Sequence, residues 1–112
     1  MGDIAQKKAK PSKSSQRPYA GTAKYKDVTD KELFFIYSEN KEIEIRNELV
    51  KRNLYIAEIL SKKFLNKGIE YEDIYQVASL GLIYAIERFD IDRGFEFSSF
   101  ATPTIIGEIK KY

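Results

Sequence analysis

The chain has 112 residues and a mass of 13.0 kDa, a length typical of one domain whose core is large enough to fold without disulfides or metals. It contains neither cysteine nor histidine, which excludes disulfides, Cys/His zinc sites and catalysis by a thiolate or an imidazole. The net charge of +2 is too small to indicate a partner.

The charge is unevenly distributed along the chain. Residues 1–26 carry seven Lys or Arg and one Asp, a net charge of +6, whereas residues 27–112 carry −4. The first segment is rich in Lys, Ser, Ala, Gly and Pro and has no periodic apolar face, so we predict a disordered basic arm over 1–26 and a folded domain over 27–112. Composition favours a solvated tail over an arm that contacts DNA phosphates. No apolar run is long enough for a membrane span or a signal peptide, so we expect a cytoplasmic protein.

Two helices are predicted in the first half of the domain. Thr29 and Glu32 have the spacing of a capping box, which predicts a short helix ending near Glu39. The next apolar residues share one helical face and predict a long second helix. They are Ile45, Leu49, Ile56, Leu60 and Phe64. This helix is expected to end at residues 66–68, with Gly68 in the left-handed conformation that follows many helices.

The third helix has the clearest period in the chain. Its core residues are Ile74, Val77, Ala78, Gly81, Leu82, Ala85, Ile86 and Phe89. Gly81 lowers helix propensity, so we expect a close helix crossing there. After a turn at residues 90–94, Ser98, Ser99 or Thr102 is expected to cap a final helix that starts near Thr102 or bends at Pro103. With no strand pair predicted, the fold class is all-α, a compact bundle of about four helices.

The third helix also has a second face, opposite its core. It carries an apolar centre with polar groups at its edge, which is typical of helix-on-helix contacts with a partner. These residues are Asp73, Gln76, Leu80, Ile83 and Tyr84. Another segment of the same chain covering them is an equally open alternative.

An aromatic segment follows the third helix. Phe95, Phe97 and Phe100 are preceded by Arg93 and followed, one helix further on, by Lys110 and Lys111. Such residues offer flat faces for unstacked bases and cations for phosphates. Periodicity alone favours the alternative that the Phe residues close the end of the bundle.

Several of these segments together resemble region 2 of the bacterial sigma-70 family of RNA polymerase sigma factors. They are Glu72–Asp90 (EDIYQVASLGLIYAIERFD) and Arg93–Ala101 (RGFEFSSFA), with Arg52–Leu54 and Phe64–Gly68 upstream. The resemblance covers roughly residues 29–112. Thr102–Ile109 (TPTIIGEI) looks most like the sporulation and general stress group of sigma factors, similar to sigma F, B and G.

The resemblance implies two binding surfaces. In the family, the Asp-x-x-Gln helix docks on a coiled coil of the polymerase β′ subunit, which implies docking by Asp73, Gln76, Ser79 and Ile83; the helix face adds Leu80 and Tyr84. Family region 2 also holds the non-template strand of the promoter −10 element. The matching positions here are Asn53, Phe95, Phe97, Ser99 and Phe100.

The resemblance has departures. Pro103 and Thr104 stand where primary sigma factors have a Trp pair, which implies weaker autonomous melting of the promoter, and Phe100 replaces the more usual Tyr. The resemblance also implies that the chain is truncated within the promoter-reading helix and lacks the family's regions 3 and 4.

Two other functions are weighed against DNA and polymerase binding. An enzyme is not expected, because no phosphate loop is present and the serines have no histidine to activate them. The spacing of Asp90, Asp92 and Glu96 does not fit a calcium loop, so neither a metal nor a cofactor is expected. The alternative function is a protein-interaction module bound by an anti-sigma factor, without independent DNA binding.

Overall fold

The computed structural model describes residues 19–65 and 68–112, which form four α-helices and two short 3-10 turns without any β-strand in these ranges. The elements in chain order are η2 (Ala23–Tyr25), α2 (Asp30–Asn40), α3 (Ile43–Lys63), α4 (Tyr71–Arg88), η3 (Ile91–Arg93) and α5 (Phe97–Lys111). The prediction of an all-α bundle of about four helices is confirmed.

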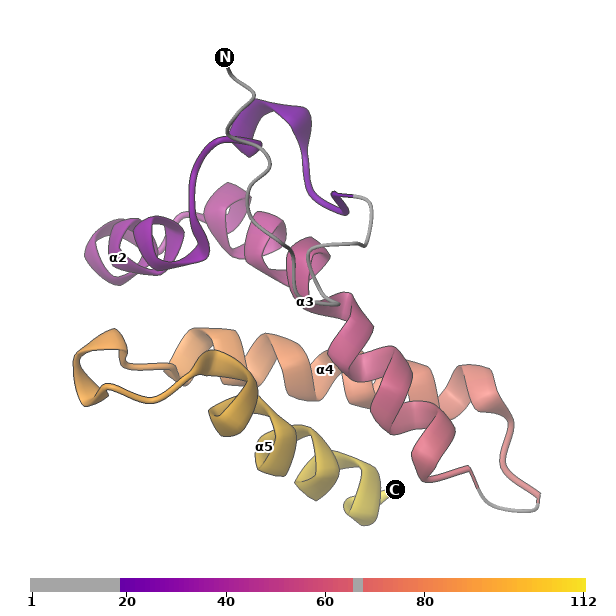
Figure 1. Ribbon diagram of the computed structural model, residues 1–112. Coiled ribbons are helices and arrows are strands. Elements are labelled where there is room, and N and C mark those ends of the chain that lie inside the picture. The colour runs from indigo at the N-terminus through magenta and orange to yellow at the C-terminus, as the bar shows by residue number, and fades with distance from the viewer. Residues whose placement is uncertain (1–18, 66–67) are drawn as a thin grey trace, which may run out of the picture.

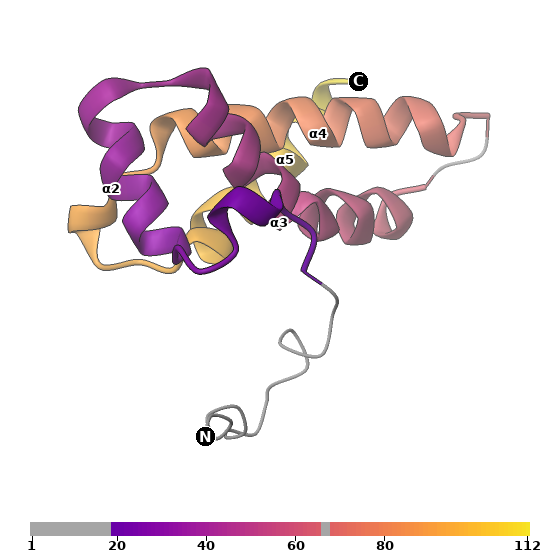
Figure 2. The same ribbon diagram turned by 90° about the horizontal axis from the view of Figure 1, so that it is seen from above.

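The helix α4 is the centre of the bundle. It packs along α3 on one side and along α5 on the other, as Figure 1 shows. At one end of the bundle α2 packs on α3 and lies beside η3 (Figure 2). The side chains between these helices form one hydrophobic core. Its most completely buried members are Leu33, Leu49, Ile74, Leu82, Ile86 and Ile105.

The first predicted helix is α2. It starts after the Thr29 cap as predicted, and its end differs from the predicted one by one residue. The Thr29 hydroxyl accepts a hydrogen bond from the Glu32 backbone N–H at 3.1 Å, and the Glu32 carboxylate accepts one from the Thr29 N–H at 2.9 Å. This reciprocal pair satisfies two donors that the first helical turn leaves without partners. The helix ends at Asn40, and Lys41 adopts the left-handed conformation with φ 55°.

The helix α3 ends earlier than predicted, at Lys63 rather than at residues 66–68. Leu60 and Ser61 are its last fully buried residues, and the Leu65 side chain is 46% exposed. Without buried contacts there is little to stabilise another helical turn. Gly68 does have a positive φ of 86°, but it lies in the connecting loop, and residues 66 and 67 are outside the described ranges.

The final helix begins five residues earlier than the predicted start at Thr102, and Glu96 rather than Ser98, Ser99 or Thr102 is its N-cap residue. Pro103 therefore lies inside α5 and cannot donate to the Ser99 carbonyl. Ser99 and Pro103 are both exposed, so water can satisfy that carbonyl. The Thr102 hydroxyl instead donates to the Ser98 carbonyl at 2.8 Å, inside the first turns.

Residues 19–26, predicted to belong to the disordered arm, are ordered against α3. The Glu48 side chain of α3 is only 1% exposed, and its carboxylate accepts hydrogen bonds from the Tyr19 hydroxyl, the Thr22 backbone N–H at 2.7 Å and the Arg52 guanidinium at 2.8 Å. The boundary predicted at residue 26 is therefore too late, because a buried carboxylate draws polar partners from this segment. Residues 1–18, the rest of the predicted arm, lie outside the described residues.

Gly81 confirms the predicted close crossing of helices. A Cβ atom at this position would lie 2.9 Å from Cα of Ile105 and 3.3 Å from Cγ of Glu108, both on α5. The two backbones of α4 and α5 therefore touch where the glycine has no side chain.

None of the helices within residues 19–65 and 68–112 combines the length and the apolar character that crossing a membrane requires.

Gly81→Ala is expected to lower the free energy of unfolding by about 1–3 kcal/mol, because the backbone of α5 must shift to admit a methyl group. Gly107→Ala in α5 is the matched control: nothing lies within 4 Å of its would-be Cβ, so it is expected to stabilise by about 0.5–1 kcal/mol through helix propensity. Urea unfolding followed by circular dichroism measures both. Equal effects of the two substitutions would contradict the close crossing.

Glu48→Gln is expected to destabilise the protein by about 1.5–3 kcal/mol at neutral pH, because charge-assisted hydrogen bonds are lost in a buried position. Burial acts to raise the pKa of Glu48, but the hydrogen bonds from Tyr19, Thr22 and Arg52 outweigh it and hold the pKa below its ordinary value. The carboxylate therefore makes its full contribution to the free energy of unfolding above its pKa in the unfolded chain, about 4.3. That contribution is lost as the pH falls through the lower pKa of Glu48 in the folded protein.

The stability difference between wild type and Glu48→Gln should accordingly narrow as the pH is lowered from about 5 toward about 2. Urea unfolding at a series of pH values measures this. Glu58→Gln, an exposed residue of the same helix, is the control and is expected to change stability by less than about 0.5 kcal/mol. If the difference in free energy of unfolding between wild type and Glu48→Gln stays constant with pH, ionisation of the Glu48 carboxylate does not stabilise the fold.

Candidate functional site

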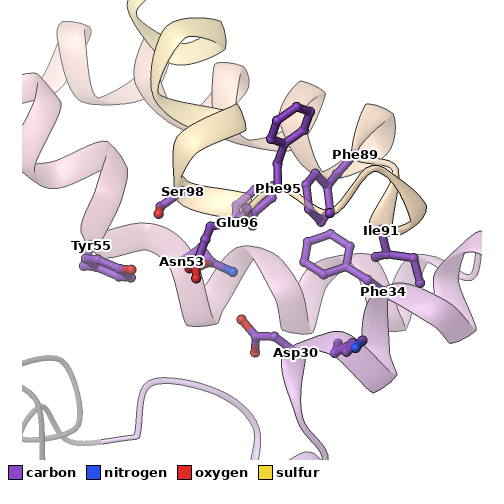
Figure 3. A pocket seen from close by; sticks show the side chains of 12 residues that line it. Asp30, Phe34, Asn53, Tyr55, Phe89, Ile91, Phe95, Glu96 and Ser98 are labelled. Atoms are coloured by element: carbon purple, nitrogen blue, oxygen red, sulfur yellow. The ribbon is translucent and has the colours of Figure 1, made fainter.

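A pocket of about 490 Å³ lies where α2, α3 and the start of α5 meet, at the end of the bundle (Figure 3). Its volume falls in the range of small-molecule sites, about 300–1,000 Å³. Phe34, Phe89 and Ile91 gather on one side of it, and Asp30, Asn53 and Ser98 lie on the other. The full set of lining residues is Asp30, Lys31, Phe34, Asn53, Tyr55, Phe89, Ile91, Gly94, Phe95, Glu96, Phe97 and Ser98.

Four aromatic rings form a packed cluster behind and along one wall of the pocket. The ring of Phe34 lies 4.9 Å from that of Phe89 and 5.1 Å from that of Phe97, and Phe89 contacts Phe97 edge-on at 5.3 Å. Phe100 completes the cluster, with its ring centre 5.6 Å from that of Phe89. These spacings are those of favourable aromatic pairs. The interpretation that Phe97 and Phe100 close the end of the bundle is therefore confirmed, and both remain only half-buried.

Phe95 differs from its neighbours in the aromatic segment. Its side chain is 62% exposed although it lines the pocket. It follows Gly94, whose positive φ of 81° turns the chain between η3 and α5. The turn thus places one ring at the mouth of the pocket, where its face is accessible to a ligand.

Polar groups from three helices line the rest of the pocket. Asn53 is buried, and its side-chain Nδ2 donates to the Leu49 carbonyl at 2.8 Å, which fixes the amide within α3. The Asp30 carboxylate accepts a hydrogen bond from the Arg52 guanidinium at 2.8 Å, and the exposed Glu96 adds a second carboxylate. The pocket therefore combines aromatic walls with hydrogen-bonding groups, two of which are carboxylates.

The other residues predicted to bind DNA do not line this pocket. Arg93 is exposed on η3, with its Nε 3.8 Å from the Asp90 carboxylate. Ser99 is exposed on the first turn of α5. Lys110 and Lys111 are exposed at the far end of α5, about 20 Å along the helix axis from Phe97. Figure 1 shows this C-terminal end on the opposite side of the bundle from η3.

The second face of α4 is accessible, as the prediction of a partner surface requires. Asp73 and Gln76 are exposed, and the Leu80 side chain is 43% exposed. Ser79, Ile83 and Tyr84 are half-buried. Within residues 19–65 and 68–112, no segment buries this face completely, which is the alternative that the sequence left open. The expected core residues of the opposite face are buried, apart from Val77 and Phe89, which are half-buried.

Sequence reasoning missed several pocket residues. Phe89 was expected only as a core position, and Asp30, Phe34, Tyr55, Ile91 and Glu96 were not expected at the site. No period in the sequence links them, because they come from α2, α3, η3 and the residues that flank α4 and α5, which only the tertiary fold brings together. The signal available was the aromatic segment 95–100, which marks one wall. Within the described ranges, no three acidic residues lie in a group that could hold a metal ion.

A comparison with protein families gives a match that covers more than half of the chain. The family model described as Sigma-70 region 2 matches residues 49–112. The matched part contains α4, α5 and most of α3, so it includes the face of α4 and most of the pocket.

Curated relatives are similar over a larger part of the chain. The RNA polymerase sigma-F factor of Bacillus subtilis is 34% identical over 90 residues, or 80% of this chain. The RNA polymerase sigma-G factor of Clostridium acetobutylicum is 34% identical over 93 residues, 81% of this chain, and the sigma-F factor of Kitasatospora aureofaciens is 43% identical over 68 residues, 61% of it. The chain spans 35%, 36% and 23% of the lengths of these three relatives, respectively.

Proposed function

The chain belongs to the sigma-70 family of RNA polymerase sigma factors, and on that premise we propose that it acts in transcription initiation by binding core polymerase and single-stranded promoter DNA, rather than by catalysis. Its similarity to sigma-F and sigma-G factors agrees with the predicted sporulation and stress group. The observation that carries the DNA-binding part is the aromatic pocket with the exposed Phe95 at its mouth.

The pocket suits a base that has left the duplex. Opening a base pair costs stacking energy, and a base held against an aromatic face recovers about 1–3 kcal/mol of it. Phe95 offers such a face to solvent, and Phe97 supplies a fixed one because Phe34 and Phe89 hold its ring. The proposed ligand is the non-template strand of the promoter −10 element.

The charges of the pocket favour entry of a base over entry of a phosphate. Asp30 and Glu96 would repel a phosphate, whereas a carboxylate or amide oxygen accepts hydrogen bonds from the amino group of a base edge. The strand backbone is therefore proposed to pass along the rim of the pocket, near Lys31, which lines the pocket and is exposed, and near the exposed Arg93. Ser99 lies beside this path, and Lys110 and Lys111 are proposed to contact phosphates further along α5.

The second face of α4 is the proposed docking surface for core polymerase. Leu80 and the half-buried Ile83 and Tyr84 supply an apolar centre, and Asp73 and Gln76 supply directional polar groups at its edge. An α-helix of a coiled coil, as in the β′ subunit, is a partner of the matching shape and chemistry. Ser79 has a side-chain oxygen that is shielded from solvent and has no hydrogen-bond partner among the described residues, so a partner could use it only after a small rotation.

The alternative function, capture by an anti-sigma factor, has one supporting observation. A second, apolar pocket of about 600 Å³ lies on the outer side of α2 and is lined by Val28, Lys31, Glu32, Phe35, Ile36 and Ile91. Phe35 is 56% exposed there. Exposed apolar surface of this kind is typical of protein contacts. It lies apart from the face of α4, so a regulator bound there would not compete directly with the docking helix.

The double variant Asp73→Ala, Gln76→Ala is expected to weaken binding to core polymerase by about 10- to 100-fold, because it removes the polar edge of the docking face. Binding of fluorescently labelled protein to core enzyme measures this. Both residues are exposed, so the melting temperature should fall only slightly, through loss of one of the two carboxylates in the first turn of α4. Glu58→Ala on α3 removes an exposed carboxylate elsewhere and is the control. Unchanged association of the double variant would refute the docking assignment.

Phe95→Ala is expected to weaken binding of a single-stranded −10 oligonucleotide by about 5- to 100-fold, through loss of one stacking face. Fluorescence anisotropy, with and without core polymerase, measures the affinity. Phe95 is a better test than Phe97, because truncating the packed Phe97 would also damage the core. Phe35→Ala removes a similarly exposed ring outside the pocket and is expected to change the affinity less than about twofold.

The same titrations repeated at several salt concentrations separate the cations from the aromatic pocket. Replacing Lys110 and Lys111 by Ala should reduce the salt dependence by about 0.7 per phosphate contact and leave the sequence preference intact. An unchanged salt slope would remove these lysines from the DNA path. If Phe95→Ala has no effect and Phe35→Ala weakens binding of an anti-sigma factor, the alternative function is favoured.

A further inference from the structure

The segment Tyr19–Thr29, here called the strap, lies against α3, where Glu48 and Arg52 contact it. Tyr25 and Val28 of the strap pack against the core but are only partly buried, and none of the residues of η2 is fully buried. Polar contacts from α3 add to this packing. The Glu48 carboxylate binds the strap at Tyr19 and Thr22, and the Arg52 guanidinium donates to the Tyr25 carbonyl at 2.5 Å.

Arg52 connects the strap to the pocket. Its Nε donates to the Glu48 carboxylate at 2.8 Å, and its Nη1 donates to the Asp30 carboxylate, also at 2.8 Å. Its remaining terminal nitrogen donates to the Tyr19 hydroxyl at 3.2 Å, and the guanidinium lies over the Tyr19 ring at 5.3 Å. All parts of this planar cation are occupied by partners within the chain, so little of it is available for a phosphate.

The partners of Arg52 include residues that define the pocket. Asp30 lines the pocket and is the first residue of α2, and Lys31, which follows it, lines the pocket too. Asn53, the neighbour of Arg52 in α3, lines it from the other helix. Figure 3 shows Asp30 and Asn53 on the same side of the pocket, from α2 and α3 respectively. One guanidinium therefore links the two helices that form this side.

We infer that Glu48 and Arg52 are positioning residues, and that through them the strap sets the position of the α2 side of the pocket. The position of that side in turn determines the affinity of the pocket for single-stranded DNA. The inference rests on the proposed function for its DNA-binding consequence. Neither Glu48 nor Arg52 lines the pocket, so both act through Asp30. Loss of the strap contacts leaves Arg52 with fewer partners, and the first turn of α2 then loses its fixed distance from Asn53.

Tyr19→Phe is the mildest test, because it removes only the hydroxyl that contacts Glu48 and Arg52. It is expected to weaken binding of the −10 oligonucleotide by about 3- to 10-fold, as for other residues coupled through one network. Glu48→Gln is expected to act in the same direction, and the double variant should be less than additive because both act through Arg52. Glu44→Gln is the matched control, since it breaks another strap contact, the 2.9 Å pair with Lys24, away from the pocket.

A second measurement reports the pocket without DNA. Nuclear magnetic resonance signals of Ile91 and Ser98, which line the pocket from η3 and α5, are expected to shift in Tyr19→Phe and not in Glu44→Gln. All titrations are made well below the melting temperature of each variant, so that a difference reports the folded state.

The outcomes separate this inference from the proposed function. If wild type does not bind the oligonucleotide, the DNA-binding proposal fails, and the shifts of Ile91 and Ser98 still decide whether the strap controls the pocket. If Tyr19→Phe and Glu48→Gln lower only the melting temperature, with wild-type affinity and unshifted pocket signals, the strap is merely structural and the inference is overturned.

Discussion

The contact between the backbones of α4 and α5 at Gly81 is the constraint on which the rest of the bundle depends. Ile105 lies where a side chain of residue 81 would be, and it is fully buried, as is Ala101 one turn earlier. Since α5 begins at Phe97, only one turn before Ala101, the crossing also fixes where Phe97 meets Phe89 at the end of α4. The aromatic wall of the pocket therefore follows from a packing contact about two turns away along α5.

The aromatic segment divides two tasks between neighbouring residues. Phe97 packs against Phe34 and Phe89, so its ring is held in one orientation by the core. Phe95 lies two residues earlier, on the far side of the helix start, and remains exposed. A rigid ring and an accessible ring thus flank the same pocket. The structure shows core packing for Phe97 and an exposed ring for Phe95, so the ligand-binding alternative remains a proposal that Phe95 can serve without loss of core contacts.

The sequence predicts the parts of the fold that depend on local or periodic signals. The capping box at Thr29, the core face of α4 and the close approach at Gly81 are all confirmed. The predicted start of α5 near Thr102 was wrong, because Pro103 lies inside the helix; the carbonyl of Ser99 that loses its hydrogen bond is exposed to water, which lowers the cost of that loss. The strap and most of the pocket were beyond prediction, because Tyr19 and Glu48 are 29 residues apart and no period connects them.

The charged network beneath the strap specifies position more than it adds net stability. Removing Glu48 and Arg52 from water is costly, and only a complete set of hydrogen bonds offsets that cost. An incomplete set leaves a buried charge without partners, so intermediate positions of the strap are disfavoured. An apolar contact would allow the strap to slide along α3, but these directional bonds do not. One defined position for Asp30 is what a pocket needs if it is to read a base edge, since hydrogen bonding tolerates only small displacements.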